Sequence, residues 1–379
     1  MRLFLRVRYA YNRISAEYYR ETAGMDMRIV HIIQRDNPYD GGAVRVAQAL
    51  CAEQCKNGHD VFIIALYDSD RHLTFREPSV MFRIKAKPGV LHWIGNFMKL
   101  KSCLKEINPQ IIHCHDGVVW PRLVLMFRKC PVIVHGHLLL KRDTFIRKVT
   151  AFLLKRSCDT IIAISRSVYD SFLPLGNRLR YVLVPNGVDF DRYHAIGDAE
   201  KKKLKSELKL PADKKILIWC GRVHAVKGPE RAWHLAKLLP EDWCLLFVGD
   251  GPALAQLHTP ENLQLVDRGK IIETGCVDST ARYLQAADAY LFCAYWEDFG
   301  LVIVEAAACD LPILSYGEIH GGATELLRKF DAQRISEDDF ADILSHVGRK
   351  VHPGIADFSW DAVNREVEKI YSESLRKDH

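Results

Sequence analysis

Long apolar runs, paired cysteines and repetitive tracts are all missing from this sequence of 379 residues. No apolar run approaches the ~20 residues that a bilayer-spanning helix needs, which excludes an integral membrane protein. The opening MRLFLRVRYAYNRISAEYY is interrupted by arginines and has no apolar core followed by a cleavage site, so it is not a secretory signal. The absence of biased tracts excludes collagen, coiled coil and disorder as the main architecture.

The cysteines are scattered rather than paired. There are eleven of them, an odd number, and none forms a CxxC motif. Several lie in apolar runs such as IIHCH, LIWCG and YLFCA, where a thiol behaves as a small buried hydrophobe. This usage predicts a reducing, cytoplasmic compartment and argues against a disulfide framework or a zinc cluster.

What is present is the composition of a soluble globular protein. Hydrophobic residues make up 48% of the chain and charged residues 26%. Because ordinary domains have roughly 100–200 residues, the length suits two.

The net charge of +6 conceals an asymmetry between the two halves. Residues 1–185 hold 29 Lys and Arg against 15 Asp and Glu, a net charge of +14, and the remainder holds 24 against 32, a net charge of −8. A basic half is expected to face an anionic surface or substrate, although a solvated surface bias is the simpler alternative. Nucleic acid is disfavoured because no basic segment is interleaved with aromatic residues.

Short apolar segments alternate with helical stretches in two successive series. The predicted strands are 27–33, 60–66, 81–86, 110–115, 131–137, 159–165 and 181–185, then 214–222, 243–251, 270–276, 288–294 and 311–317. Continuous apolar strands separated by helices indicate parallel sheets covered on both faces. The predicted fold class is therefore α/β, with two doubly wound Rossmann-like domains facing across a cleft that is the default ligand site.

The break between the two series defines the expected domains. Residues 1–26 form an N-terminal extension without clear periodicity, and Met27 opens the fold proper. The N-terminal domain spans 27–185, the C-terminal domain spans 186–358, and 359–379 are expected to form a terminal helix that crosses back.

The segment YWEDFGLVIVEAAACDLPILS carries Glu297 and Glu305 after a predicted strand. Glu297 precedes a Phe-Gly turn, and Glu305 lies about one and a half turns inside the following helix. The N–H groups of Gly300, Leu301 and Val302 have no acceptor within such a helix, so they offer a cradle for a diphosphate.

Two further loops carry groups suited to phosphate. In CGRVHAVKGPE, Arg222 closes a strand and Lys227 opens the next helix, and two cations there could neutralise a diphosphate without a metal. In NPYDGGAVRVAQAL, Gly41 and Gly42 follow the first strand and let the backbone approach a phosphate or sugar closely.

Taken together, these motifs resemble glycosyltransferase family 4. The resemblance rests on GG (41–42), HG (135–136), PNGVD (185–189), GR-x4-KG (221–228), VGDGP (248–252), E-x7-E (297–305) and GG-x2-E (321–325). They occur in order between about 27 and 376, nearly the whole chain. The family consists of retaining enzymes of the two-domain GT-B type, which use nucleotide sugars without a metal, so the resemblance implies no cofactor.

The resemblance also implies a role for each matching residue. Arg222 and Lys227 would bind the donor diphosphate, with Gly41 and Gly42 close to it. Glu297 would contact the hydroxyls of the donor sugar, Glu305 the ribose, Val277 the base, and His135 the sugar near its reacting carbon. The chain departs from the family at Asp310, where a glycine is common, and this puts a turn geometry in question rather than the chemistry.

The function that these motifs favour is a retaining hexosyltransferase with a saccharide or lipid-linked saccharide as acceptor. A UDP-hexose is the favoured donor and GDP-mannose the second. No carboxylate is placed as a nucleophile, so the resemblance implies a front-face reaction in which the departing phosphate takes the acceptor proton.

Three alternatives remain open. Asp68, Ser69 and Asp70 form a DxD motif, which holds a metal in another class of glycosyltransferase. The pairs His113/His115 and His135/His137 would each lie on one face of a strand, as in a metal-dependent hydrolase. A sugar-nucleotide 2-epimerase shares the two-domain architecture.

The basic half suggests where the protein works. Its cations on two predicted helices and their flanks are Arg122, Arg128, Lys129, Lys141, Arg142, Arg147, Lys148, Lys155 and Arg156. Such side chains could hold the protein peripherally on anionic lipid. The resulting hypothesis is a cytoplasmic enzyme docked on the inner leaflet that glycosylates a lipid-linked glycan of a bacterial surface polysaccharide.

Overall fold

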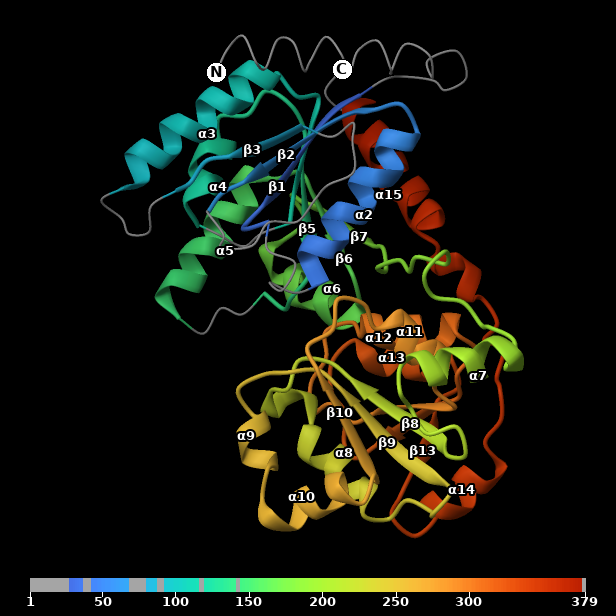
Figure 1. Cartoon of the computed structure of the whole chain (residues 1–379). Coiled ribbons are helices and arrows are strands. Elements are labelled where there is room, and N and C mark those ends of the chain that lie inside the picture. The colour runs from blue at the N-terminus through green and yellow to red at the C-terminus, as the bar shows by residue number, and fades with distance from the viewer. Residues whose placement is uncertain are drawn as a thin grey trace. The chain divides into compact units, whose positions relative to one another are not determined.

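The computed structural model describes residues 27–36, 42–67, 80–86, 92–115, 119–140 and 144–376. The chain divides into two compact units (Figure 1). Unit 1 comprises Met1–Pro185 and Trp360–His379, and unit 2 comprises Asn186–Ser359. Residues 1–26, Gly41, the Asp68–Asp70 motif, Lys141 and Arg142 lie outside the described residues.

Unit 1 is built on a parallel sheet of seven strands. Its strands are β1 (Arg28–Ile33), β2 (Asp60–Ala65), β3 (Val80–Arg83), β4 (Ile111–Cys114), β5 (Val132–Gly136), β6 (Thr160–Ala163) and β7 (Arg180–Leu183). Their order across the sheet is β3-β2-β1-β4-β5-β6-β7. The strands are almost wholly apolar because helices cover the sheet on both faces.

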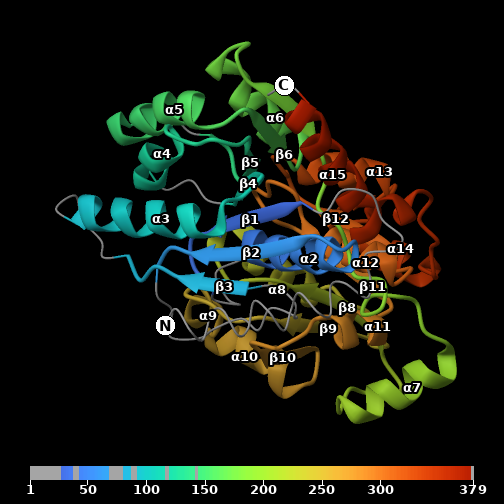
Figure 2. The same ribbon diagram turned by 90° about the horizontal axis from the view of Figure 1, so that it is seen from above.

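The helices of unit 1 form two layers about this sheet (Figure 2). They are α2 (Gly42–Lys56), α3 (Trp93–Ile107), α4 (Val119–Leu125), α5 (Phe145–Ser157), α6 (Arg166–Phe172), the 3-10 turn η2 (Leu173–Leu175) and α15 (Trp360–Arg376). Helices α2 and α15 cover one face, and α3, α4 and α5 lie side by side on the other.

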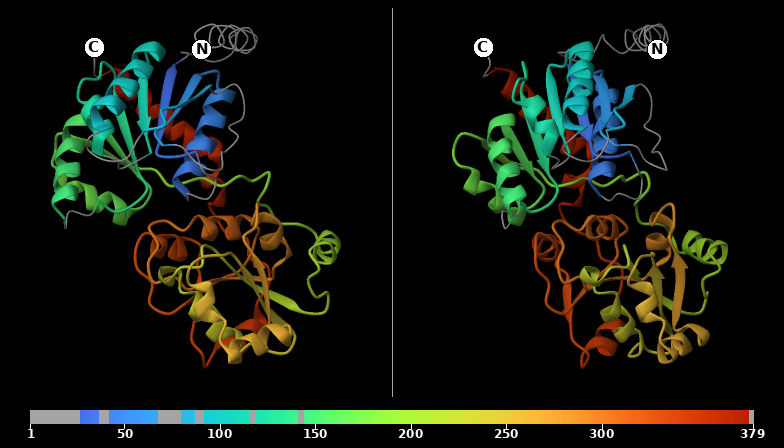
Figure 3. Two further views of the ribbon diagram at one scale, coloured as in Figure 1. Left: turned by 60° about the vertical axis from the view of Figure 1, so that its left-hand side comes forward. Right: turned by 90° about the vertical axis from the view of Figure 1, so that its left-hand side faces the viewer.

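The C-terminal helix α15 returns to unit 1 after the chain has formed unit 2, as expected from the sequence (Figure 3). Its buried residues Val363, Val367, Ile370 and Tyr371 recur at helical spacing. This stripe packs against Ile29, Ile111, Ile133 and Ile162 of the sheet and against Val46 and Leu50 of α2. The apolar face of α15 is therefore part of the core of unit 1.

Unit 2 is built on a parallel sheet of six strands. These are β8 (Lys215–Cys220), β9 (Trp243–Val248), β10 (Ile271–Gly275), β11 (Ala289–Phe292), β12 (Ile313–Tyr316) and β13 (Gln333–Ile335). Their order is β10-β9-β8-β11-β12-β13. The short edge strand β13 is the only described strand that the sequence analysis missed, because three residues, two of them exposed, carry no apolar run.

The helices of unit 2 are short. They are α7 (Asp198–Glu207), α8 (Pro229–Ala236), α9 (Leu254–Leu257), α10 (Pro260–Asp267), α11 (Ala281–Ala286), α12 (Leu301–Ala308), α13 (Ala323–Lys329) and α14 (Phe340–His346), with 3-10 turns η3 (Ala225–Lys227) and η4 (Ile355–Phe358). With both sheets doubly wound, the predicted α/β architecture of two Rossmann-like domains is confirmed.

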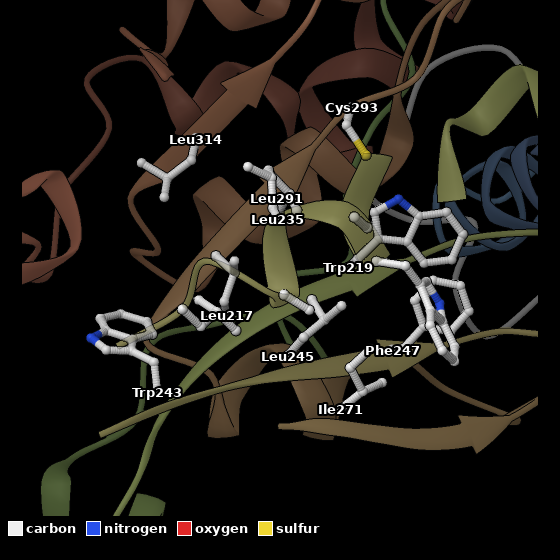
Figure 4. Packing of buried hydrophobic residues seen from close by; sticks show 14 of the residues in the cluster. Leu217, Trp219, Leu235, Trp243, Leu245, Phe247, Ile271, Leu291, Cys293 and Leu314 are labelled. Carbon is white, nitrogen blue, oxygen red and sulfur yellow. The ribbon is translucent and has the colours of Figure 1, made fainter. Parts of the chain in front are cut away.

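The core of unit 2 is centred on stacked aromatic rings (Figure 4). The ring of Trp219 on β8 lies parallel to that of Phe247 on β9, with centroids 4.4 Å apart. Trp233 of α8 meets Phe247 edge-on at 5.8 Å. All three side chains are buried, so this packing fixes α8 over strands β8 and β9.

The strand order of each sheet reverses once. In unit 1 the reversal lies between β1 and β4, and in unit 2 between β8 and β11. At such a point the loops after the two strands leave in opposite directions, which opens a crevice at the carboxyl edge where ligands of this fold class bind.

Among the described residues, no helix combines the length and the apolar character needed to cross a bilayer.

The aromatic core supports a stability prediction. Phe247→Ala removes a ring with no solvent exposure that contacts two tryptophans, so the free energy of unfolding should fall by about 3–5 kcal/mol. The same truncation at Phe127, which is 75% exposed, should change it by less than about 0.5 kcal/mol. Urea unfolding of both variants measures the difference, and equal losses would contradict the assigned core.

Candidate functional site

The loop after β8 carries the two cations that the sequence singled out. Arg222 is exposed, and Lys227 ends the turn η3 and is half-buried. Two backbone hydrogen bonds anchor this loop to the end of β9 and the loop after it. The N–H of Val223 donates to the carbonyl oxygen of Asp250 at 3.0 Å, and the N–H of Gly221 donates to the carbonyl oxygen of Val248. The cations therefore stand on a loop anchored at the carboxyl edge of β8 and β9.

Lys227 forms an ion pair with the Glu297 carboxylate across the β8/β11 reversal. The two side chains keep 30% and 21% of their surface exposed. The sequence marked both residues but not their contact, because they are 70 positions apart. The pair brings a cation and a carboxylate to one point at the carboxyl edge of the sheet.

Gly228 allows the turn that carries Lys227 to press against the end of β11. Its φ is +63°, and a Cβ there would lie 2.1 Å from the carbonyl oxygen of Cys293. The thiol of Cys293 donates to the carbonyl oxygen of Gly228 at 3.1 Å. A side chain at this position is excluded by contact and by backbone conformation, which explains the KG motif.

The Glu297 loop is fastened by the GG-x2-E segment. The N–H of Glu297 donates to the carbonyl oxygen of His320, and that of Ala323 donates to the carbonyl oxygen of Glu297, each at 3.1 Å. Gly321, with φ +91°, is needed because a Cβ would meet that same Glu297 oxygen at 2.4 Å. The carboxylate of Glu297 therefore extends from a backbone bonded on both sides.

Helix α12 begins beside this loop, as the sequence predicted. Gly300 precedes it with φ +94°, and the N–H of Ile303 donates back to the Gly300 carbonyl at 2.9 Å. The N–H groups of Leu301 and Val302 occupy the first turn, where helix geometry provides no acceptor. The positive end of the helix dipole thus lies next to the Lys227–Glu297 pair in sequence and fold.

Glu305 is placed by a threonine that the sequence analysis did not single out. The hydroxyl of Thr280 donates to the Glu305 carboxylate at 3.4 Å and lies 3.1 Å from the hydroxyl of Tyr193. Thr280 follows the half-buried Val277 by three residues. Sequence offered no signal for this link, since a threonine before a helix is an ordinary capping residue.

His135 and Gly42 belong to unit 1. Gly42 is the first residue of α2. His135 lies in β5, and its side chain is 3% exposed. The two HxH pairs lie on one face, as alternation predicted, together with His31. Their ring nitrogens bond to each other, to Gln54 and to Tyr371, and no carboxylate bonds them within the described chain.

Burial keeps these imidazoles uncharged. It lowers the pKa of His31 to about 4 and holds the pKa values of His113, His115 and His135 well below the ordinary value of 6.5. Neighbouring imidazoles lower the pKa values of the last three further. The rings are neutral hydrogen-bonding groups at pH 7.

The backbone at Asp310 explains why this residue can stand where the family commonly has a glycine. It adopts a φ of +55°, the left-handed conformation that glycine favours after a helix. Aspartate is among the few other residues that tolerate it. The turn after α12 is therefore retained.

Two family models match the chain. One, described as Glycosyltransferase Family 4, covers residues 40–192, and the other, Glycosyl transferases group 1, covers 200–345. The N-acetyl-alpha-D-glucosaminyl L-malate synthase of Bacillus anthracis is 25% identical over 90% of this chain and 96% of its own. The glycosyltransferase TuaC of Bacillus subtilis, assigned to teichuronic acid biosynthesis, is 23% identical over 75% of each chain.

A solved structure has the same fold. HepE of Anabaena, in complex with UDP and glucose, superposes with a TM-score of 0.73 at 20% identity, covering 92% of this chain and all of that one. The comparisons give no support to the 2-epimerase or the metal-dependent hydrolase. With the fold and the ordered motifs, they show that the chain belongs to glycosyltransferase family 4, the group 1 glycosyltransferases of GT-B type.

Proposed function

We propose that this glycosyltransferase moves a hexose from a nucleotide sugar to a saccharide, with retention of configuration and without a metal ion. The observation that carries the proposal is the Lys227–Glu297 pair at the strand-order reversal of unit 2. The pair sets a cation and a carboxylate beside the N-terminus of α12, which supports binding of a diphosphate and of sugar hydroxyls.

The donor diphosphate is bound by positive groups that the chain itself supplies. Arg222 and Lys227 carry full charges, and the first-turn N–H groups of Leu301 and Val302 add hydrogen-bond donors. An exposed arginine can bind phosphate oxygens in a bidentate manner. These groups oppose the charge that grows on the leaving diphosphate, the part of the reaction where electrostatic stabilisation counts most.

The sugar and nucleoside are held by carboxylates and backbone. Glu297 accepts hydrogen bonds from sugar hydroxyls while its ion pair with Lys227 orients the carboxylate. Glu305, positioned by Thr280, accepts from the ribose hydroxyls, and the backbone at Val277 packs on the base. For unit 1 we propose the roles that the family resemblance implies, with His135 as a ligand of the donor sugar and Gly42 as a ligand of the diphosphate.

Retention follows a front-face route in this proposal. The acceptor hydroxyl attacks the anomeric carbon from the side that the diphosphate leaves, the C–O bond to the diphosphate breaks, and the acceptor proton passes to the departing phosphate oxygen. Glu297 is engaged with Lys227 and serves as a sugar ligand rather than a nucleophile. A UDP-hexose is the favoured donor, with GDP-mannose second.

Arg222→Ala and Glu305→Ala should abolish measurable transfer without unfolding the protein. Arg222→Ala removes a donor that stabilises charge on the leaving group, which lowers kcat by about 100- to 1,000-fold. Glu305→Ala removes the acceptor proposed for the ribose hydroxyls. Both side chains keep contact with solvent, so melting temperatures should change little. Release of UDP from UDP-glucose and of GDP from GDP-mannose measures turnover, with Arg365→Ala on the exposed side of α15 as the matched control. Near wild-type turnover in either site variant would refute the assignment.

Chelation should leave the rate of transfer unchanged. The charge on the leaving group is met by Arg222, Lys227 and the start of α12, so no divalent ion is required. Initial rates after dialysis against EDTA, with and without added Mn²⁺, test this. A loss of activity that Mn²⁺ restores would favour the DxD motif at Asp68–Asp70 instead.

The acceptor is proposed to be lipid-linked, and the protein to dock on the anionic inner leaflet. Helices α3, α4 and α5 lie side by side on one face of unit 1. The exposed apolar side chains on these helices and on the segment after α4 include Ile94, Met98, Phe127, Phe145 and Phe152. The exposed cations of the same segments are Lys99, Lys101, Lys105, Lys129, Lys148 and Arg156.

Exposed apolar and basic groups on neighbouring helices are suited to a bilayer interface with anionic lipid. Each Lys or Arg near such a surface contributes about 1 kcal/mol of attraction. Arg156 lies 3.8 Å over the ring of Phe152, so the two form an amphipathic unit. The relative TuaC is named for teichuronic acid biosynthesis, which supports a saccharide acceptor.

Two of the cations expected on this surface are corrected by the structure. Arg122 is only 1% exposed and lies inside unit 1, so it cannot reach lipid. Arg128 is half-buried and paired with Asp159, which offsets its charge. Sequence could not distinguish them because helical arginines are usually exposed.

Binding to vesicles should rise with anionic lipid and collapse at about 0.5 M salt, where charges are screened. Lys148→Glu with Arg156→Glu on α5 should weaken co-sedimentation several-fold. The same charge change on unit 2, Lys202→Glu with Lys203→Glu on α7, should have little effect because those residues lie off the proposed surface. Equal recovery on neutral and anionic vesicles would refute docking and leave the sugar transfer standing.

A further inference from the structure

Five histidines meet at the carboxyl edge of three adjacent strands in unit 1. They share the sheet face that α2 and α15 cover, and four are buried while the last is half-buried: His31, His113, His115, His135 and His137. The rings of His135 and His137 lie stacked with centroids 4.4 Å apart. A neutral imidazole has one N–H donor and one acceptor nitrogen, so each ring can link two neighbours in one of two directions.

The buried amide of Gln54 sets that direction. Its Oε1 can only accept, and it lies 2.7 Å from Nε2 of His31. Its Nε2 can only donate, and it lies 3.2 Å from the hydroxyl of Tyr371. His31 therefore carries its proton on Nε2, and Tyr371 receives a hydrogen bond and has its own O–H free to donate onward.

The branch through Tyr371 ends at His135. The tyrosine O–H donates to Nδ1 of His113 at 2.5 Å, so the proton of His113 is on Nε2. That nitrogen lies 3.2 Å from Nδ1 of His135 and donates to it. His135 must then carry its proton on Nε2, a buried atom that has no hydrogen-bond partner among the described residues.

The other branch leads from His31 to His137, which directly follows β5, the strand that carries His135. Nδ1 of His31 accepts from Nε2 of His115 at 2.9 Å, and Nδ1 of His115 accepts from Nε2 of His137 at 3.1 Å. The bonds form one directed chain that starts at His137, passes through Gln54 and ends at His135. Hydrogen bonds that all point the same way polarise one another, which strengthens the last donor.

We propose that Gln54 and Tyr371 are positioning residues that lock His135 as an Nε2–H donor for an oxygen of the donor sugar. Burial supports this by keeping the imidazoles neutral. The assignment of a sugar oxygen rests on the proposed function. The tautomer itself rests only on the hydrogen-bond chain.

Because Tyr371 lies on α15, the C-terminal helix supplies part of the apparatus that orients a residue of β5. Gln54 lies on α2, which places the anchor of the chain on the helix packed beside α15. The two helices thus determine on which nitrogen His135 carries its proton, although no described residue of either helix forms a hydrogen bond with that nitrogen.

Nitrogen-15 NMR of the full-length protein with labelled histidine tests the tautomer directly. Long-range proton–nitrogen correlations distinguish Nε2–H from Nδ1–H rings, and His135→Ala and single alanine variants assign the signals. The expected result is Nε2–H for all five rings at pH 7. An Nδ1–H tautomer, a charged ring or a metal-shifted signal at His135 would overturn the proposal.

Tyr371→Phe then separates positioning from packing. It removes only the O–H, so the Nε2–H signals of His113 and His135 should shift toward the average of two tautomers, while His31, His115 and His137 keep theirs through Gln54. Loss of one oriented hydrogen bond should lower kcat/KM for the donor by about 5- to 10-fold.

The matched control is Tyr181→Phe, which removes the hydroxyl that donates to the Gly176 carbonyl at 2.8 Å elsewhere in unit 1. It should leave all five tautomers and kcat/KM unchanged. A shift of all five rings in Tyr371→Phe, or an equal loss of kcat/KM in both variants, would show a structural effect and reject the positioning role. If the tautomers are as expected but the protein turns over no nucleotide sugar, the proposed function is wrong and the assignment of the hydrogen-bond chain remains valid.

Discussion

The constraint on which this structure depends is the right-handed crossover of parallel strands. A chain that winds first to one side and then to the other must reverse its strand order once in each sheet. The reversal lies between β1 and β4 in unit 1 and between β8 and β11 in unit 2. Arg222 and Lys227 follow β8, and Glu297 and Glu305 follow β11, so the winding of the chain selects where these charged groups come together.

Close backbone contact turns that crevice into a defined site. Gly228 and Gly321 let two loops press on the carbonyl oxygens of Cys293 and Glu297, where any side chain would collide. These contacts bring Lys227 and Glu297 into an ion pair. The glycines are therefore as necessary to the site as the charged residues, because they fix the distance between the two strands' loops.

Unit 1 shows how a polar network can be buried without charge. The five histidines of this network are neutral because burial lowers their pKa values. His31, His113 and His115 each link two neighbours through both ring nitrogens. A network of this kind is stable only when its members are satisfied, and here Gln54 and Tyr371 satisfy its centre. The C-terminal helix is held both by its apolar stripe and by this polar contact.

The sequence by itself determined the alternation of strands and helices, the two Rossmann-like sheets, the returning helix and the family, because apolar periodicity and glycine-bearing motifs are local signals. It also placed Arg222, Lys227, Glu297 and Glu305 at strand or helix ends. Only the tertiary structure decided that Lys227 meets Glu297, that Thr280 holds Glu305 and that Arg122 is buried. Those contacts join residues far apart in the chain, and periodicity carries no information about which side chains the winding of a sheet brings together.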